Sequence, residues 1–150
     1  MASGLLKADG SLISVFGCFD SRSFHWSEFS FPSTLQLSPY LKTLLEPVKS
    51  EEVSLRLELG LHEALVNAVK HGNSQDPSKS LRIRRILTPN WLVWQIQDEG
   101  NGLPSLKRNG LLPSRVDSDR GRGLFLIHEC FDDVRWSRRG NRVQLACRRR

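Results

Sequence analysis

The segment Leu61–Asn73 reads LHEALVNAVKHGN, and its polar residues decide how this chain is interpreted. Glu63 and Asn67 are four residues apart, so they lie on one face of the helix that their leucine, alanine and valine neighbours predict. Because those neighbours are apolar, they leave little of the helix surface to face solvent. We therefore expect the two polar side chains to line a groove. A carboxylate one turn before a carboxamide suits a general base beside a magnesium ligand. An isolated pair with this spacing is more often a solvated helix face.

A second group of residues closes a predicted strand about 30 residues further on. Trp91–Asp98 alternates, and Asp98 continues the apolar face that Leu92, Trp94 and Ile96 begin. A carboxylate on such a face is unfavourable unless something satisfies it, and conflicts of this kind often mark functional sites. Gly100 and Gly102 follow at once and allow a ligand to approach the backbone closely. An ordinary turn after a strand is the alternative.

A third group opens another predicted helix, which we expect from Gly123 to Phe131. Gly121-Arg122-Gly123 precedes the apolar residues of that helix. Backbone amides at a helix start attract phosphate oxygens, although an ordinary glycine-containing helix entry explains the pattern equally well. Arg120 and Arg122 either neutralise phosphates or are surface charges.

The order and spacing of these groups resemble the GHKL ATPase superfamily. Within it, the chain resembles the anti-sigma factor serine/threonine kinases, which are also called switch-protein kinases. Glu63–Asn73 is similar to the asparagine box of that superfamily, Asp98–Gly102 to its first glycine box, and Gly121–Ile127 to its second. The resemblance covers roughly Phe29 to Leu145.

This resemblance implies an ATP-binding kinase with Glu63 as general base and Asn67 as the Mg²⁺ ligand. Asp98 would accept a hydrogen bond from the adenine amino group. The ATP-binding residues implied in this way are Asn67, His71, Asp98, Gly100, Gly102, Gly121, Arg122, Gly123 and Leu124. The implied partners are a small antagonist protein with a phosphorylatable serine or threonine and, as a sequestered target, a sigma factor. A homodimer is a weaker implication. The alternative is a non-catalytic module that uses nucleotide only to set its affinity for a protein partner.

The pattern predicts an α/β two-layer sandwich with a mixed, mostly antiparallel sheet and helices on one face (the GHKL, or Bergerat-type, fold). We expect an N-terminal arm over residues 1–22, flexible or weakly attached, and one ATP-binding kinase domain over residues 23–150.

Alternation predicts a strand with one register break over Phe24–Phe31. Ser38-Pro39 predicts a helix start with a serine cap followed by a proline. Ser50-Glu51-Glu52 predicts a second helix start with acids in its first turn. The remaining predicted strands are Leu81–Thr88, Trp91–Asp98, Val134–Trp136 and Val143–Leu145. Residues 103–119 contain one glycine, two prolines, three serines and charges of both signs, and we expect them to form a lid over ATP.

The charge, the apolar runs and the cysteines of the chain bear on whether it binds nucleic acid, spans a membrane or contains disulfides. The formal net charge is +6, and residues 134–150 contain seven arginines and no acidic residue. That segment suits a nucleic-acid phosphate backbone, an acidic protein partner or plain solvent exposure, and the first is disfavoured because no nucleic-acid-binding motif accompanies it. No apolar run is long enough to span a membrane. Three scattered cysteines without metal-ligand spacing indicate free thiols and a cytoplasmic protein.

Overall fold

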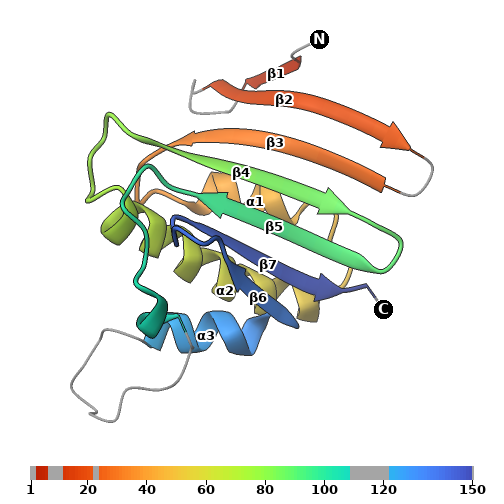
Figure 1. The fold of residues 1–150 in the computed structure, drawn as a ribbon. Coiled ribbons are helices and arrows are strands. Elements are labelled where there is room, and N and C mark those ends of the chain that lie inside the picture. Colours follow the sequence, from red (N-terminus) through yellow and green to blue (C-terminus); the bar gives the residue numbers. More distant parts are fainter. Residues whose placement is uncertain (1–2, 7–11, 22–23, 109–121, 150) are drawn as a thin grey trace.

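The structure is a computed structural model that describes residues 3–6, 12–21, 24–108 and 122–149. One seven-stranded sheet organises these residues, in the strand order β1-β2-β3-β4-β5-β7-β6, and every pair of neighbours in it is antiparallel. The strands are β1 (Ser3–Leu6), β2 (Leu12–Ser21), β3 (Phe24–Pro32), β4 (Ser80–Leu87), β5 (Trp91–Gln97), β6 (Asp133–Trp136) and β7 (Arg142–Arg148) (Figure 1). The two outermost strands, β1 and β6, have only four residues each.

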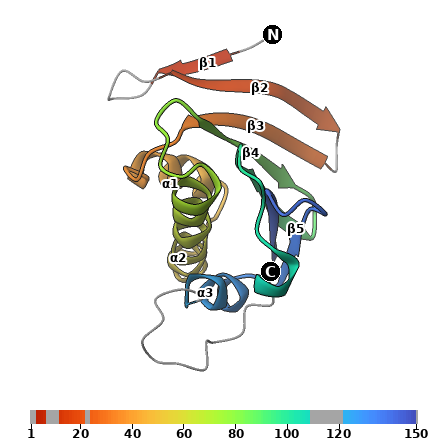
Figure 2. The same ribbon diagram turned by 60° about the vertical axis from the view of Figure 1, so that its left-hand side comes forward.

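Among the described residues, three α-helices lie on one face of this sheet (Figure 2). They are α1 (Ser38–Leu45), α2 (Glu51–Asn67), which continues into a π-helical turn η1 (Ala68–Gly72), and α3 (Arg122–Cys130). A 3-10 turn η2 (Ser105–Lys107) follows β5. The α/β two-layer sandwich expected from the sequence is confirmed. None of these helices is both long and apolar enough to cross a membrane.

The core lies between the helices and the inner face of the sheet. Leu57, Leu61 and Leu65 of α2 are each 0% exposed, as their helical spacing predicts. They face a layer of strand residues whose buried members alternate along each strand. The largest of those strand residues are Phe29, Phe31, Leu81, Ile83, Trp94, Ile96, Val143 and Leu145.

Long side chains tie the helix ends to the sheet. The last carbonyl groups of a helix have no partner within the helix. Trp94 Nε1 donates to Leu44 O at 3.1 Å, and Arg85 donates from a terminal guanidinium nitrogen to Thr43 O at 2.7 Å, so β4 and β5 satisfy the end of α1. Arg56 of α2 donates to Cys130 O at 2.9 Å and so satisfies the end of α3.

At the helix starts, one prediction agrees with the structure and the other does not. Ser50 caps α2, because its hydroxyl oxygen accepts a hydrogen bond from Val53 N at 3.3 Å. The predicted serine cap of α1 is wrong: Ser38 is the first helical residue, and the cap position is Leu37, which makes no side-chain cap bond. Leu37 is buried in the core, so packing rather than a side-chain hydrogen bond fixes this helix start.

The register break predicted within Phe24–Phe31 is also wrong. Strand β3 pairs with β4 without interruption from His25 to Pro32. Phe29 and Phe31 point into the core, whereas Phe24 and Trp26 lie on the opposite face of the same regular strand. The irregularity belongs to β2, between Phe16 and Phe19. Strand β3 therefore has an apolar group on each face, and Phe24 remains 39% exposed.

The N-terminal segment contributes strands that the sequence analysis did not predict. Ser3–Leu6 and Leu12–Ser21 form β1 and β2, and β2 pairs with β3. The sheet thus begins within the region that we expected to form a weakly attached arm. The flexibility of residues 1–22 and the boundary at residue 23 stay predictions.

We predict that Leu57→Ala lowers the free energy of unfolding by about 2–5 kcal/mol, because it leaves a cavity under the sheet. Leu55→Ala is the matched control on the same helix. Leu55 is 63% exposed, whereas Leu57 is 0% exposed. The control should change stability by less than about 0.5 kcal/mol. Urea denaturation of both variants measures the difference, and equal midpoints would contradict the assignment of the buried face of α2.

Candidate functional site

Helix α2 and its π-helical continuation carry most of the polar residues that the sequence analysis singled out. Glu63 and Asn67 lie one turn apart on α2, and both are partly buried. The helix then widens over Ala68–Gly72, where Asn73 N donates to Ala68 O at 2.8 Å. Such π-helical turns are rare and often occur at functional sites. The π-helical turn ends at Gly72.

The start of α3 lies directly against Glu63 and Asn67. A Cβ atom at Gly123 would be 2.8 Å from Glu63 Oε2 and 3.6 Å from Asn67 Nδ2. Any side chain at position 123 would therefore displace the Glu63 carboxylate. The structure thus brings Glu63 and Asn67 against Gly123, which lies 56 residues after Asn67 in the sequence.

A second cluster forms where η1 meets the end of β5. A Cβ atom at Gly72 would overlap the carboxyl group of Asp98, and one at Gly100 would overlap the carbonyl oxygen of Gly72. Gly100 N donates to Asp98 Oδ1 at 2.7 Å and holds the carboxylate in the turn after β5. Both glycines are thus required for the close approach of this turn to the end of η1.

Burial raises the pKa of the Asp98 carboxyl above its ordinary value, although the hydrogen bond from Gly100 and the charges of Arg139 and Lys79 act in the opposite direction. The ionised carboxylate is therefore less favourable in the folded protein than in the unfolded chain. Any stability that protonated Asp98 supplies is present below the unfolded-state pKa and is lost as pH rises through the folded-state pKa. Above that pH, Asp98 destabilises the fold.

Asn73 fixes both sides of this cluster and is fully buried, at 0% exposure. Its side-chain oxygen accepts a hydrogen bond from Glu99 N at 2.8 Å, directly after Asp98. Its side-chain nitrogen donates to Ser80 O at 3.1 Å and to Ser33 Oγ at 3.3 Å. Ser80 N in turn donates to Glu99 Oε2 at 2.7 Å. The sequence pattern of Leu61–Asn73 did not predict this role of Asn73.

The other predicted site residues lie in different settings. His71 is exposed on η1, and Arg122 is exposed at the start of α3. Gly102 has a φ of +93° and sits against Arg139 of the β6–β7 turn, so a left-handed backbone and close packing both require glycine there. Leu124 packs against the core, so its side chain is a packing group. Gly121 lies outside the described residues.

The predicted lid, residues 103–119, is described only as far as Arg108. Arg108 Nε donates to Leu103 O at 2.7 Å, and a terminal nitrogen of the same guanidinium donates to Ser137 O at 3.3 Å. His128 Nε2 lies 3.1 Å from Arg108 O. This first part of the segment is therefore fastened to the β6–β7 turn and to α3. Residues 109–119, on which the lid prediction mainly depends, lie outside the described residues.

The fold has a match among known protein families. The profile of the histidine kinase-like ATPase domain matches residues 40–147, which span α1 to β7. The chain belongs to this family. The match contains both glycine clusters and the Glu63–Asn67 pair. No curated protein matches the chain in a sequence search.

A histidine kinase-like ATPase domain binds ATP, and the described residues fit that ligand. Gly72, Gly100 and Gly123 bring Asp98, Glu63 and Asn67 so close to the neighbouring backbone that a Cβ atom at any of the three glycines would clash. Mg²⁺ prefers oxygen ligands and commonly takes one or two from the protein and the rest from phosphates and water. The carboxamide oxygen of Asn67 is a suitable ligand of that kind. The assignment of the ATPase superfamily is confirmed, and the individual site residues stay predictions.

We predict that Asn73→Ala lowers the free energy of unfolding by about 1–3 kcal/mol, because the hydrogen bonds of the buried Asn73 carboxamide to Glu99, Ser80 and Ser33 are lost. The variant should also weaken ATP binding, since the turn that carries Asp98 is no longer held against Gly72. Asn101→Ala, which changes an exposed asparagine in the same turn, is the matched control. Urea denaturation and calorimetric titration with ATP measure the two effects. Parent-like stability of Asn73→Ala would refute the role of this side chain.

Proposed function

We propose that this chain is an ATP-binding serine/threonine protein kinase that acts as an anti-sigma-type switch protein and phosphorylates a small antagonist protein. One observation carries the proposal: Glu63 and Asn67 lie one helical turn apart, and both face the glycine at the start of α3. A base, a metal ligand and a helix start suited to phosphate thus meet at one place. The family match supports ATP as the phosphate donor.

Glu63 would accept the proton of the substrate hydroxyl during transfer. Its side chain is 26% exposed, which leaves the carboxylate accessible while the helix and α3 restrict its motion. The proton would pass from the serine or threonine oxygen to the Glu63 carboxylate as that oxygen attacks the γ-phosphorus, while the bond from the γ-phosphorus to the bridging oxygen breaks and ADP leaves. His62, whose Nδ1 lies 3.9 Å from Glu63 Oε1, is the neighbouring polar group.

Asn67 and the glycine clusters would position the nucleotide. Asn67 would hold Mg²⁺, which neutralises phosphate charge when it is bound with ATP. Asp98 would accept a hydrogen bond from the adenine amino group and thereby select adenine over guanine. His71 and the backbone around Gly123 and Leu124 are proposed phosphate contacts, and Gly100 and Gly102 are proposed to line the base.

The resemblance to the anti-sigma factor kinases supports the choice of partner. It implies a small antagonist protein as phosphoacceptor, a sigma factor as sequestered target, a homodimer and a cytoplasmic location. A non-catalytic module that binds its partner in a nucleotide-dependent manner is the competing function. The two functions differ in whether phosphate reaches the partner.

We predict that Asp98→Asn has opposite effects on stability and on ligand binding. The ligand-free variant should resist urea better than the parent at neutral pH, and this advantage should shrink as pH falls and the parent carboxyl takes up its proton. Affinity for ATP should fall by about 1.5 kcal/mol or more, the magnitude of a hydrogen bond to a charged group. If calorimetry shows an unchanged affinity for ATP, Asp98 does not contact the adenine amino group, whatever the stability measurement gives.

The kinase assignment predicts different defects in Glu63→Ala and Asn67→Ala. Removal of the base should slow phosphoryl transfer by roughly 10²–10⁴-fold and leave ATP binding nearly intact. Asn67→Ala should impair both binding and transfer, because the Mg²⁺ that Asn67 would hold would neutralise phosphate charge in both steps. Glu58→Ala removes an exposed carboxylate from the same helix and is the control.

The measurement follows ATP binding and transfer of labelled γ-phosphate to a small protein that co-purifies with the native chain. A parent that binds ATP and this protein but transfers no phosphate would establish the binding module instead. Transfer by Glu63→Ala at the parental rate would show that this carboxylate is not the base.

A further inference from the structure

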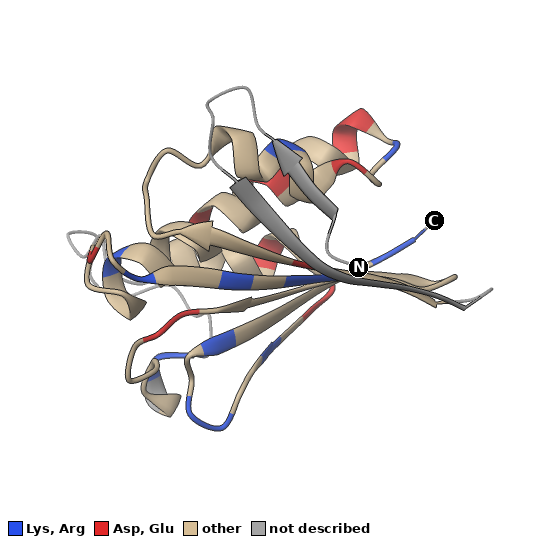
Figure 3. Cartoon of the chain, turned by 90° about the horizontal axis from the view of Figure 1, so that it is seen from above, with Lys and Arg blue, Asp and Glu red and all other residues tan. Residues whose placement is uncertain are grey.

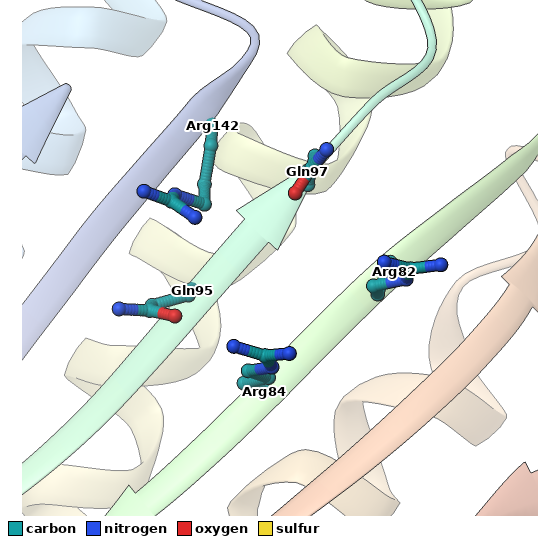
Figure 4. Close-up of a pocket in the computed structure, with 5 residues that line it drawn as sticks. All are labelled: Arg82, Arg84, Gln95, Gln97 and Arg142. Carbon is teal, nitrogen blue, oxygen red and sulfur yellow. The ribbon is translucent and has the colours of Figure 1, made fainter. Parts of the chain in front are cut away.

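The face of the sheet opposite the helices carries an ordered pattern of charge. Strand register places Arg82, Gln97 and Arg142 in one row across β4, β5 and β7. The next row contains Arg84 and Gln95. Figure 3 shows Lys and Arg along the strands of the sheet, and Figure 4 shows these five side chains together on the side away from the helices. We call this set the arginine hollow.

The charge of the arginine hollow is only partly balanced. Glu28 of β3 forms an ion pair with Arg84 and lies 3.8 Å from Arg82, and its own side chain is 14% exposed. The side chains of Arg82 and Arg84 remain 63% and 46% exposed. Within the part of the chain that the structure describes, Arg142 has no acidic side chain within 4.0 Å. The hollow therefore retains positive charge that faces solvent.

An apolar hollow adjoins the arginine hollow on the same face. It is lined by Phe24, Trp26 and Ile86 and shares Arg84 and Gln95 with the arginine hollow. The Arg84 guanidinium lies over the Trp26 ring, 5.8 Å from its centroid, and so stands between the two hollows. Aromatic and arginine side chains in this combination are enriched at protein–protein interfaces.

The size and lining of the two hollows favour a protein partner over other anions. The arginine hollow has a volume of about 130 Å³, below the range of about 300–1,000 Å³ in which drug-sized ligands bind, and suits one acidic side chain. A duplex phosphate backbone would gain nothing from the apolar hollow and would be repelled by Glu28. An acidic segment that also carries an aliphatic or aromatic residue complements both hollows.

We propose that this outer face of the sheet is a docking surface for an acidic segment of a partner protein. A carboxylate of the partner occupies the arginine hollow, and an apolar side chain of the same segment occupies the hollow of Phe24, Trp26 and Ile86. The surface is separate from the candidate ATP site, because Glu63 and Asn67 lie in the helical layer on the other side of the sheet. The proposal does not rest on kinase activity.

The test measures binding of a fluorescent synthetic peptide that alternates Asp or Glu with Leu or Phe. Arg142→Glu should weaken binding by about tenfold or more, because one ion pair is replaced by a like-charge contact. Arg138→Glu makes the same charge change at an exposed position in the β6–β7 turn and should have little effect. Phe24→Ala should weaken this peptide but not one that contains acidic residues alone.

Three outcomes would overturn the proposal. If Arg142→Glu and Arg138→Glu lose equal affinity for the peptide, the attraction is a general effect of charge. If the peptide fails to bind the parent even at low salt, this face is not a docking surface for such a segment. Single-stranded DNA that binds more tightly than the peptide, and loses affinity through Arg142→Glu, would assign the face to nucleic acid. Glu63→Ala should bind the peptide like the parent, so failure of the kinase assignment and failure of this one are distinguishable.

Discussion

The geometry of the site depends on the hydrogen bonds of the buried Asn73 carboxamide. Its three hydrogen bonds join the end of the long helix to residues that follow β3, begin β4 and follow β5. Immediately after it, Ser74 and Gln75 adopt φ values of 54° and 56°, which are uncommon for non-glycine residues. Two such residues in succession are unfavourable in isolation, and they persist because Asn73 fixes the chain on their N-terminal side and Ser80 fixes it afterwards. The same bonds hold Asp98 against Gly72.

The sheet separates two chemically different surfaces. Its helical side holds a carboxylate, a carboxamide and a buried aspartate around glycines, which suits a nucleotide. Its other side holds arginines and aromatic side chains that the helices do not cover. Because β4 and β5 contribute to both sides through alternating residues, a ligand on one face contacts strands that also border the other. The buried Trp94 and the outward Gln95 are neighbours in sequence and lie on opposite surfaces.

Much of the fold follows from periodicity in the sequence, because burial and side-chain spacing coincide. Leu57, Leu61 and Leu65 predicted the buried stripe of α2, and alternation predicted β4, β5 and β7 to within about three residues at each end. The Glu63–Asn67 spacing predicted two polar groups on one helical face, and Asp98 stood out because it breaks an apolar pattern. Each of these features is encoded by residues that are close together in the sequence, so the sequence alone was enough to predict it.

Other features depend on contacts that no local pattern carries. The role of Asn73 arises from partners 7, 26 and 40 residues away. Trp26 and Phe24 were interpreted as part of a broken strand because a period of two does not reveal that both faces of a strand are apolar. Arg85 points inward, where α1 supplies a carbonyl acceptor. That acceptor is known only once the helix is placed.

The short edge strands set the manner in which this domain can meet other chains. A long, flat edge offers unpaired backbone groups on which a foreign strand can add, and that route leads to aggregation. Here the described edges, β1 and β6, supply four residues each, and β6 carries the ion pair between Arg135 and Asp133. At the β6 edge, backbone-mediated polymerisation therefore finds little template. At the other edge, β1 pairs only with Leu12–Val15 of β2, so Phe16–Ser21 extends beyond its partner and is the longer stretch on which a foreign strand can add.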